Sequence, residues 1–176
     1  MKIHILIFEL FVCLIPFTSL AQVHDNSSGE VGSQLIEMHY SKLDSIIDNA
    51  KNYIDIKYLY GGSSESGFDC SGFIFYVFNQ FNVSLSRSSS RLSKMGEFID
   101  LKNIREGDLL FFKGRDLNSE NVGHVSLVIE KKQSSFKMIH ATRRGVVVDF
   151  YDNMTYYQER FLFAKRIFVF DETCDL

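Results

Sequence analysis

The sequence has little cysteine and proline, no tryptophan and no excess of basic residues. Its 176 residues include three cysteines, one proline, and 19 Lys and Arg against 22 Asp and Glu, for a net charge of −3 and a pI near 5.9. Such a chain has no basic excess to neutralise phosphates, so we expect no nucleic-acid partner. No internal repeat and no second domain are visible. Hydrophobic residues nevertheless make up 45% of the chain, and 17 are phenylalanines, which predicts a folded domain with a real core.

The first 21 residues have the pattern of a secretory signal peptide. Lys2 supplies a positive charge, residues 3–20 are mostly apolar, and Ser19-Leu20-Ala21 places small residues at the −3 and −1 positions of a cleavage site. The alternative is a membrane anchor, but the run is marginal in length for a span and contains Glu9. We therefore expect a signal peptide over 1–21 that is removed before Gln22. The protein is then exported, to the periplasm or to the exterior and cell wall, without a stable membrane anchor.

Two cysteines remain after this cleavage, because Cys13 leaves with the signal peptide. In an exported protein Cys70 and Cys174 could form one disulfide. Cys174, however, lies in a polar C-terminal tail, residues 171–176, and pairing would silence Cys70 as a nucleophile. We expect Cys174 to be a free thiol without catalytic consequence.

Cys70 lies in the most informative segment of the chain, Asp69-Cys70-Ser71-Gly72. A glycine-rich turn over 61–67 precedes it, and an apolar run over 73–78 follows. A cysteine at a loop-to-helix junction faces unpaired backbone N–H groups and the positive end of the helix dipole, and both favour the thiolate. The segment predicts a nucleophilic cysteine at a helix N-terminus, provided that a histidine base lies elsewhere.

The rest of the chain divides into a helical first half and a strand-rich second half. Small polar residues predict a flexible mature N-terminus over 22–32, and a three- and four-residue apolar spacing predicts helices over 33–57 and 71–81. Short apolar runs between turns predict strands over 108–112, 124–130, 136–141, 146–150 and 161–170. This order favours an α+β fold with N-terminal helices on one face of an antiparallel sheet. We expect one domain, over 33–170, and a monomer.

The mature chain offers four histidines as a base. His24 lies in the predicted flexible tail and His39 on the apolar stripe of the first helix, which leaves His124 and His140 at the ends of two neighbouring strands. Because a short turn joins these two strands, we expect them to form a hairpin.

The register of this hairpin decides whether the two histidines meet. If Val128 lies opposite Phe136, His124 and His140 are direct cross-strand neighbours with Cβ atoms ~5 Å apart. A slip by one residue would put them on opposite faces. The sequence leaves the register open, so the pairing is a hypothesis: Cys70 as nucleophile, His124 as base and His140 orienting His124.

A cysteine and two histidines also allow a metal interpretation. Only three candidate ligands are present, however, and the chain has no Cys-x-x-Cys pair. Nucleophilic catalysis is therefore the favoured interpretation, and we expect no metal and no cofactor.

With these residues in view, the chain resembles the NlpC family of cell-wall cysteine peptidases, a papain-like group. The resemblance covers roughly residues 46–168. Six motifs carry it, in order: Tyr58-Leu59-Tyr60-Gly61-Gly62, Phe68-Asp69-Cys70-Ser71-Gly72-Phe73, Leu85-Ser86-Arg87-Ser88-Ser89, Gly107-Asp108-Leu109, Gly123-His124-Val125 and Ile139-His140-Ala141. Ser86 departs from the family pattern, which has proline at this position.

The resemblance implies an endopeptidase that cuts peptidoglycan stem peptides between γ-linked D-glutamate and the following diamino acid. By the family's pattern, Cys70, His124 and His140 are catalytic, and Tyr58 helps to stabilise the oxyanion. Asp69 and Ser71 would recognise the free amine of the stem peptide's L-alanine, although Asp69 could equally cap the helix. Arg87 either neutralises a substrate carboxylate or forms a surface salt bridge. The insert 114–121 would shape the rim of the cleft.

Two other functions remain open at this point. A papain-like amidase or acyltransferase acting on another acyl substrate would use the same thioester chemistry at Cys70. A non-catalytic cell-wall-binding protein could keep the fold, but it would have no need of the complete Cys-His-His set.

Overall fold

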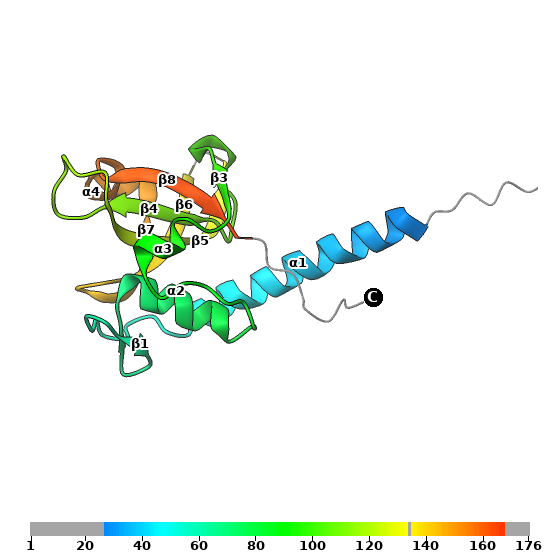
Figure 1. Ribbon diagram of the computed structural model, residues 1–176, viewed down its shortest axis with the longest axis horizontal. Coiled ribbons are helices and arrows are strands. Elements are labelled where there is room, and N and C mark those ends of the chain that lie inside the picture. The colour runs from blue at the N-terminus through cyan, green and yellow to red at the C-terminus, as the bar shows by residue number, and fades with distance from the viewer. Residues whose placement is uncertain (1–26, 134, 168–176) are drawn as a thin grey trace, which may run out of the picture.

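The computed structural model describes residues 27–133 and 135–167 (Figure 1). A six-stranded antiparallel sheet has the strand order β3-β8-β4-β5-β6-β7, and a separate two-stranded hairpin is formed by β1 and β2. The strands are β1 Ser63–Ser64, β2 Gly67–Phe68, β3 Glu97–Ile99, β4 Leu109–Lys113, β5 Val122–Lys132, β6 Ser135–Thr142, β7 Gly145–Phe150 and β8 Phe161–Arg166. The predicted α+β class with an antiparallel sheet is confirmed.

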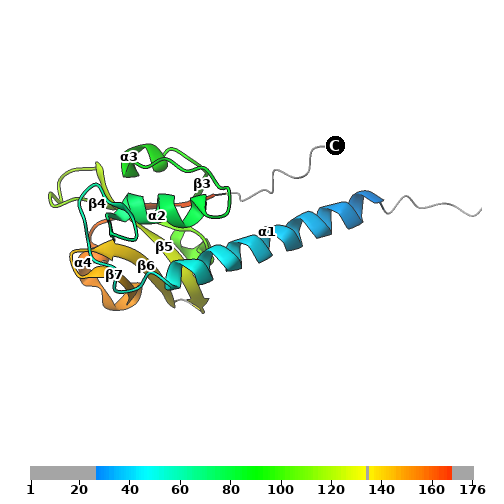
Figure 2. The ribbon, with the colours of Figure 1, turned by 90° about the horizontal axis from the view of Figure 1, so that it is seen from below.

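The helices lie mainly on one side of this sheet. They are α1 Ser27–Lys51, α2 Cys70–Asn79, α3 Ser89–Leu92 and α4 Thr155–Gln158, with 3₁₀ turns at Leu101–Asn103 and Tyr151–Asn153. Figures 1 and 2 show α2 against the sheet and the first half of α1 extending beyond the body of the molecule. No helix in the described part of the chain is both long enough and apolar enough to span a bilayer.

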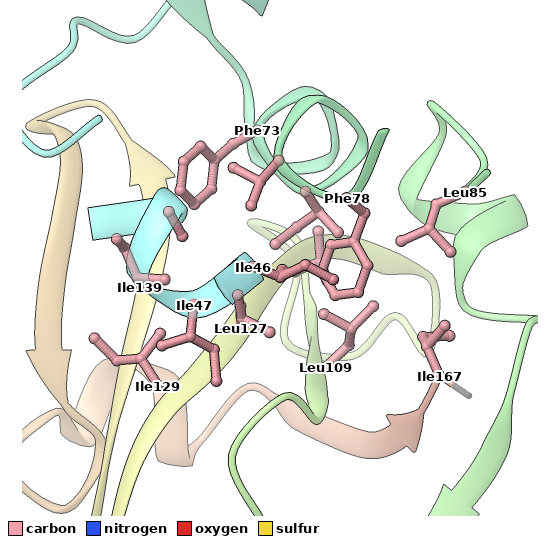
Figure 3. Close-up of a cluster of buried hydrophobic side chains, with 14 of the residues drawn as sticks. Ile46, Ile47, Phe73, Phe78, Leu85, Leu109, Leu127, Ile129, Ile139 and Ile167 are labelled. Atoms are coloured by element: carbon pink, nitrogen blue, oxygen red, sulfur yellow. The ribbon is translucent and has the colours of Figure 1, made fainter. Parts of the chain in front are cut away.

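Alternation along the strands builds a core on each face of the sheet. Leu109 and Phe111 of β4 face α1 and α2, in a cluster that includes Ile46 and Phe73 (Figure 3). The intervening residues of β4, Leu110 and Phe112, face the opposite way and pack with residues of the Tyr151–Asn153 turn and α4. Because successive strand residues point to opposite faces, a fully apolar strand such as β4 fills both cores at once.

The first helix is displaced toward the N-terminus relative to the prediction. It begins at Ser27 rather than Ser33, so the described part of the segment expected to be flexible is helical. It ends at Lys51, six residues before the predicted end, because the chain then turns to join the sheet. Asp55 adopts a positive φ of 70°, its N–H donates to the Val146 carbonyl, and the Val146 N–H donates to the Ile56 carbonyl.

Several predicted segments fall on residues that the structure does not describe. These are the signal peptide, residues 22–26, the last residues of the strand expected to reach 170, and the tail with Cys174. The short strands β1, β2 and β3 were not predicted, since two- and three-residue strands carry too few residues for a recognisable alternation.

The β5–β6 hairpin contains a correction that matters for the site. Lys131 lies opposite Phe136 and Glu130 opposite Lys137, but Val128 then lies opposite Met138, so Ile129 is an extra residue, a β-bulge. The hypothesis that Val128 faces Phe136 is therefore wrong by two residues. A two-residue shift keeps every side chain on its face, so the two histidines become diagonal neighbours instead of direct ones.

Candidate active site

Cys70 is the first residue of α2, and Asp69 is its N-cap. The backbone of Asp69 is extended, with φ −93° and ψ 176°, and its carboxylate accepts a hydrogen bond of 2.7 Å from the Gly72 N–H. A carboxylate in this position satisfies one of the unpaired N–H groups of the first helical turn. The loop-to-helix junction predicted from the sequence is thus present, with the helix starting one residue earlier than expected.

The resting state of the thiol differs from the sequence expectation. Burial, followed by the negative charge of Asp69, raises the pKa of Cys70 above its ordinary value. Hydrogen bonding from the backbone at Val125, Ser71 and Cys70 acts in the opposite direction but does not prevail. The helix N-terminus alone therefore does not ionise this thiol, and its proton must be taken by a base when it reacts.

His124 and His140 form a hydrogen-bonded pair. His124 Nε2 lies 2.9 Å from His140 Nδ1, and the residues come from β5 and β6. The prediction that the two histidines share one face of the hairpin is confirmed, although the register that brings them together is a different one. Burial, with His140 as a second cause, lowers the pKa of His124 well below 6.5, so the ring is neutral at rest.

A carboxylate that the sequence reasoning missed lies behind this pair. Asp149 of β7 places Oδ2 3.0 Å from His140 Nε2, and Arg144 pairs with both of its oxygens. The hydrogen bond from His140, together with Arg144, lowers the pKa of Asp149 to about 2. Burial lowers the pKa of His140 despite this carboxylate, so the line of groups is neutral histidine, neutral histidine and carboxylate.

Tyr157 of α4 covers the histidine pair and was also missed. Its ring centroid lies 5.6 Å from that of His124, with the planes 28° apart, and 4.9 Å from that of His140. Burial raises the pKa of Tyr157 to about 12, so it remains a neutral phenol. The ring covers His140, which is fully buried, and one face of His124, which still lines the cavity beside Cys70.

A second network lies under the N-terminus of α2. Arg87 donates to both carboxylate oxygens of Asp69, at 2.7 and 2.9 Å, to Ser71 Oγ at 3.1 Å and to the Gly62 carbonyl at 2.7 Å. Arg87 thus forms the salt bridge that was one of its two expected roles, although the pair is part-buried rather than on the surface. Asp69 caps the helix, which was one of the two roles expected for it.

Gly72 is required by this network for a steric reason. A Cβ at this position would lie 2.0 Å from the Gly62 carbonyl oxygen and 2.6 Å from Arg87 Nη2. The Ser-Gly step after Cys70 therefore lets the guanidinium pass against the backbone of the helix.

Two cavities open on either side of Cys70. One, of about 450 Å³, is lined by Cys70 and His124 together with the base of the 114–121 insert, as Gly114 and Arg115. The other, of about 420 Å³, is lined by Cys70 together with Asp69, Ser71 and Arg87. Tyr58 lines both, and its pKa is raised by burial and then, once Cys70 is ionised, by the thiolate charge. A larger hollow of about 710 Å³ between α1 and the end of α2 contains none of these groups.

The donor set does not suit a metal ion. His140 uses both ring nitrogens, one toward His124 and one toward Asp149. Within residues 27–133 and 135–167, no group of three or more His, Cys, Asp and Glu side chains is arranged to hold a metal.

Comparison with known proteins identifies the family of the chain. Residues 55–166 match the model of the NlpC/P60 family. The chain belongs to the NlpC/P60 family. The matched segment contains every residue of the site described above, from Tyr58 to Tyr157.

Three curated relatives of the chain have names that describe γ-glutamyl or murein hydrolysis. The chain is 30% identical over 174 residues to a γ-DL-glutamyl hydrolase of Bacillus subtilis, covering 97% of this chain and 38% of that protein. It is 31% identical to a γ-D-glutamyl-L-lysine dipeptidyl-peptidase of Bacillus cereus, covering 70% and 36%. Murein DD-endopeptidase MepS/murein LD-carboxypeptidase of Escherichia coli is 31% identical, with 69% and 61% covered. The chain thus spans well under half the length of the two Bacillus proteins.

A solved structure of an NlpC/P60 family protein from Bacillus cereus superposes with a TM-score of 0.64 at 29% identity. The superposition covers 72% of this chain and 40% of that one. Members of the family have a papain-like fold, and in this chain a cysteine at a helix N-terminus and a histidine of the sheet line one cavity.

Proposed function

We propose that the protein is an exported cysteine peptidase that hydrolyses peptidoglycan stem peptides at the bond between γ-linked D-glutamate and the diamino acid. One observation carries the proposal: Cys70 at the start of α2 lines the same cavity as His124, whose far nitrogen is bonded to His140. The names of the relatives, which act on γ-glutamyl and murein bonds, support the substrate class.

Neutral His124 begins the reaction as a general base. It takes the proton of the Cys70 thiol, whose raised pKa keeps it protonated until substrate arrives, and Sγ attacks the scissile carbonyl carbon. The oxyanion that forms is stabilised by the Cys70 backbone N–H and the Tyr58 hydroxyl. His124 then gives its proton to the leaving amine, and water hydrolyses the Cys70 thioester by the reverse sequence of proton transfers.

Ser71 contacts the free amine of the substrate in this proposal, and Asp69 supports it. Asp69 already accepts hydrogen bonds from the N–H groups of Gly61 and Gly72 and from two nitrogens of Arg87. A carboxylate has about four acceptor sites, so these bonds use its capacity. In this proposal the hydroxyl of Ser71, on the cavity wall, makes the contact, while Asp69 and Arg87 hold Ser71 and the helix start in place.

The first experiment compares the purified protein with Cys70→Ala and Cys174→Ser variants. Each is incubated with L-Ala-γ-D-Glu-diaminopimelate and with a D-Ala–diaminopimelate cross-linked muropeptide, and the products are identified by mass spectrometry. Release of L-Ala-γ-D-Glu by the native and Cys174→Ser proteins, with none from Cys70→Ala, is the expected result. Cleavage of the cross-link alone would move the bond to the one named for MepS. Intact substrates with folded native protein would favour another acyl substrate or a binding role.

Export is tested separately by the N-terminus of the protein recovered from cells. Sequencing from the periplasmic or extracellular fraction is expected to begin at Gln22. Recovery of Met1 from the cytoplasmic fraction would overturn the export part of the proposal.

A further inference from the structure

The hydrogen-bonded line that starts at His124 does not end at the third residue of the expected triad. Asp149 lies beyond His140, with a side chain only 10% exposed and its oxygens shared between His140 Nε2 and Arg144. We propose that Asp149, held by Arg144, is a positioning residue that sets the tautomers of both histidines so that His124 can act as the base. This inference rests on the proposed function for its kinetic consequence but not for its structural one.

The tautomers follow from which groups are able to donate. An ionised carboxylate only accepts hydrogen bonds, so His140 Nε2 must carry a proton toward Asp149. Neutral His140 then has an unprotonated Nδ1, which accepts from His124 Nε2 across 2.9 Å. His124 is left with its lone pair on Nδ1, the nitrogen that remains to take the thiol proton.

The carboxylate also stabilises the charged state of the reaction. When His124 takes the thiol proton it becomes a cation, and the polarised His140 ring connects it to the negative charge of Asp149. Because these groups are buried, the attraction is screened less than it would be in water. Asp149 thereby supplies the formal negative charge that a third histidine lacks.

The first test replaces the Asp149 carboxylate with a neutral amide, which can donate a hydrogen bond as well as accept one. In Asp149→Asn, the amide NH₂ can donate to His140 Nε2, which reverses both tautomers; we expect kcat to fall by about 10²-fold or more with KM within about threefold. Asp149→Glu is expected to recover part of this loss. Asp152→Asn, a matched change at an exposed carboxylate on the neighbouring turn, is expected to leave kcat unchanged. A kcat for Asp149→Asn within threefold of native would overturn the proposal.

A measurement on the native protein keeps the test independent of folding and of substrate. The ¹⁵N shifts of the histidine side chains report which ring nitrogen carries the proton. We expect protonated Nε2 and unprotonated Nδ1 for both His124 and His140. An Nδ1–H tautomer at either residue contradicts the inference even if the protein proves to have a different substrate.

A second inference comes from the charges that line the larger of the two cavities beside Cys70. Its charged lining residues are all cations: Lys113, Arg115 and Arg143. Lys113 is paired with Glu120 at 2.6 Å, but within the described residues neither arginine side chain forms an ion pair or a hydrogen bond. On the other side of Cys70 the charge of Arg87 is balanced by Asp69.

This asymmetry indicates which part of a substrate each cavity receives. The amine-bearing acyl part fits the side of Ser71 and Asp69, so the leaving group occupies the cavity of Arg115 and Arg143. We infer that this cavity selects a leaving amino acid that carries a side-chain carboxylate, as diaminopimelate does and lysine does not. The inference rests on the proposed function and names the preferred substrate within it.

Two substrates that differ only in that carboxylate provide the test. L-Ala-γ-D-Glu-diaminopimelate-D-Ala is expected to be cleaved with a kcat/KM at least tenfold above that of the L-lysine peptide. Arg115→Gln/Arg143→Gln is expected to reduce this preference to within threefold, whereas Arg105→Gln/Lys94→Gln, with the same charge change at exposed sites outside the cavity, retains it. Equal cleavage of both peptides by the native protein overturns the inference, while cleavage of neither is a failure of the proposed function.

Discussion

Two aspartate–arginine pairs flank Cys70, and they are built for different tasks. Asp69 and Arg87 lie under the N-terminus of α2, where Arg87 is 30% exposed and ties together the Gly62 loop, the cap and Ser71. Asp149 and Arg144 lie behind the histidines, where Arg144 is 55% exposed and the carboxylate is directed at a ring nitrogen. The first pair holds backbone in place, and the second orients a side chain.

The difference shows that pairing alone does not reveal the role of a charge. A guanidinium with several partners in different segments acts as a structural tie, and its loss leaves a carboxylate and a carbonyl unsatisfied. An exposed guanidinium on one carboxylate contributes little to stability but helps to keep that carboxylate in one position. Substitutions on the two sides should therefore have effects of different kinds.

The largest expected contrast is between Arg87→Met and Arg144→Met. We expect Arg87→Met to lower the free energy of unfolding by about 3 kcal/mol, because Asp69 loses its partner in a part-buried site. Arg144→Met should cost less than about 1 kcal/mol, because its side chain is mostly exposed and His140 still bonds Asp149. Urea unfolding followed by circular dichroism measures both, and equal losses would erase the distinction.

A smaller loss of stability is expected at acidic pH, where Asp149 becomes protonated. The pKa of Asp149 is lowered from 3.8 to about 2, so its contribution to stability is fully present above about pH 4 and is lost as pH falls toward 2. This shift corresponds to about 2 kcal/mol. The difference in unfolding free energy between native protein and Asp149→Asn should be constant above pH 4 and should narrow below it. For Asp152→Asn, the difference in unfolding free energy from the native protein should not change with pH.

The two histidines give a second pH dependence on the same side of the molecule, which begins at a higher pH than that of Asp149. Their pKa values are lowered by burial in the fold, so the unfolded chain binds protons first as pH falls below 6.5. Stability is therefore expected to be full above pH 6.5 and to decrease below it by up to about 1.4 kcal/mol per pH unit for each histidine that stays neutral in the fold. His124→Gln should reduce this slope in urea unfolding between pH 7 and 5. An unchanged slope would mean that His124 is not held neutral.

The smallest stability effect is expected for Ser71→Ala on the helix side. Its hydroxyl is 3.4 Å from Asp69 and 3.1 Å from Arg87 Nη1, long distances that predict a loss of under about 1 kcal/mol. If Ser71 binds the substrate amine, KM for peptides with a free N-terminus should rise about tenfold, and N-acetylated peptides should be unaffected. A rise for both peptide types would indicate a general change in the site instead.

Much of this arrangement could be predicted from the sequence, because its signals are local. The Asp-Cys-Ser-Gly junction and the long strands follow from short-range patterns, whereas the shared face of His124 and His140 depends on the bulge at Ile129, which the sequence does not reveal. The pKa of Cys70 could not be predicted in the same way, since its direction depends on burial and on the charge of Asp69 as well as on the helix dipole.

Asp149 was missed although a sequence signal for it exists. The β6–β7 hairpin pairs Thr142 with Gly145 and His140 with Val147, so Asp149 is two residues further along β7 on the His140 face. The two-residue Arg143-Arg144 turn between these strands is enough to predict that Asp149 lies on the His140 face. Tyr157 has no such signal, because the turn that returns α4 to the sheet brings it to the histidines through tertiary packing.

The bulge at Ile129 restricts how the length of this hairpin can vary. The pairs next to the turn, Lys132 with Ser135 and Lys131 with Phe136, would by themselves set a register in which His124 and His140 point to opposite sides of the sheet. The extra residue, Ile129, shifts the register by one, so that His124 and His140 point to the same side of the sheet. A change of two residues between the histidines therefore keeps them on one face, whereas a change of one residue does so only where a bulge is gained or lost with it. Deletion of Ile129 should leave the two histidines together in a regular hairpin.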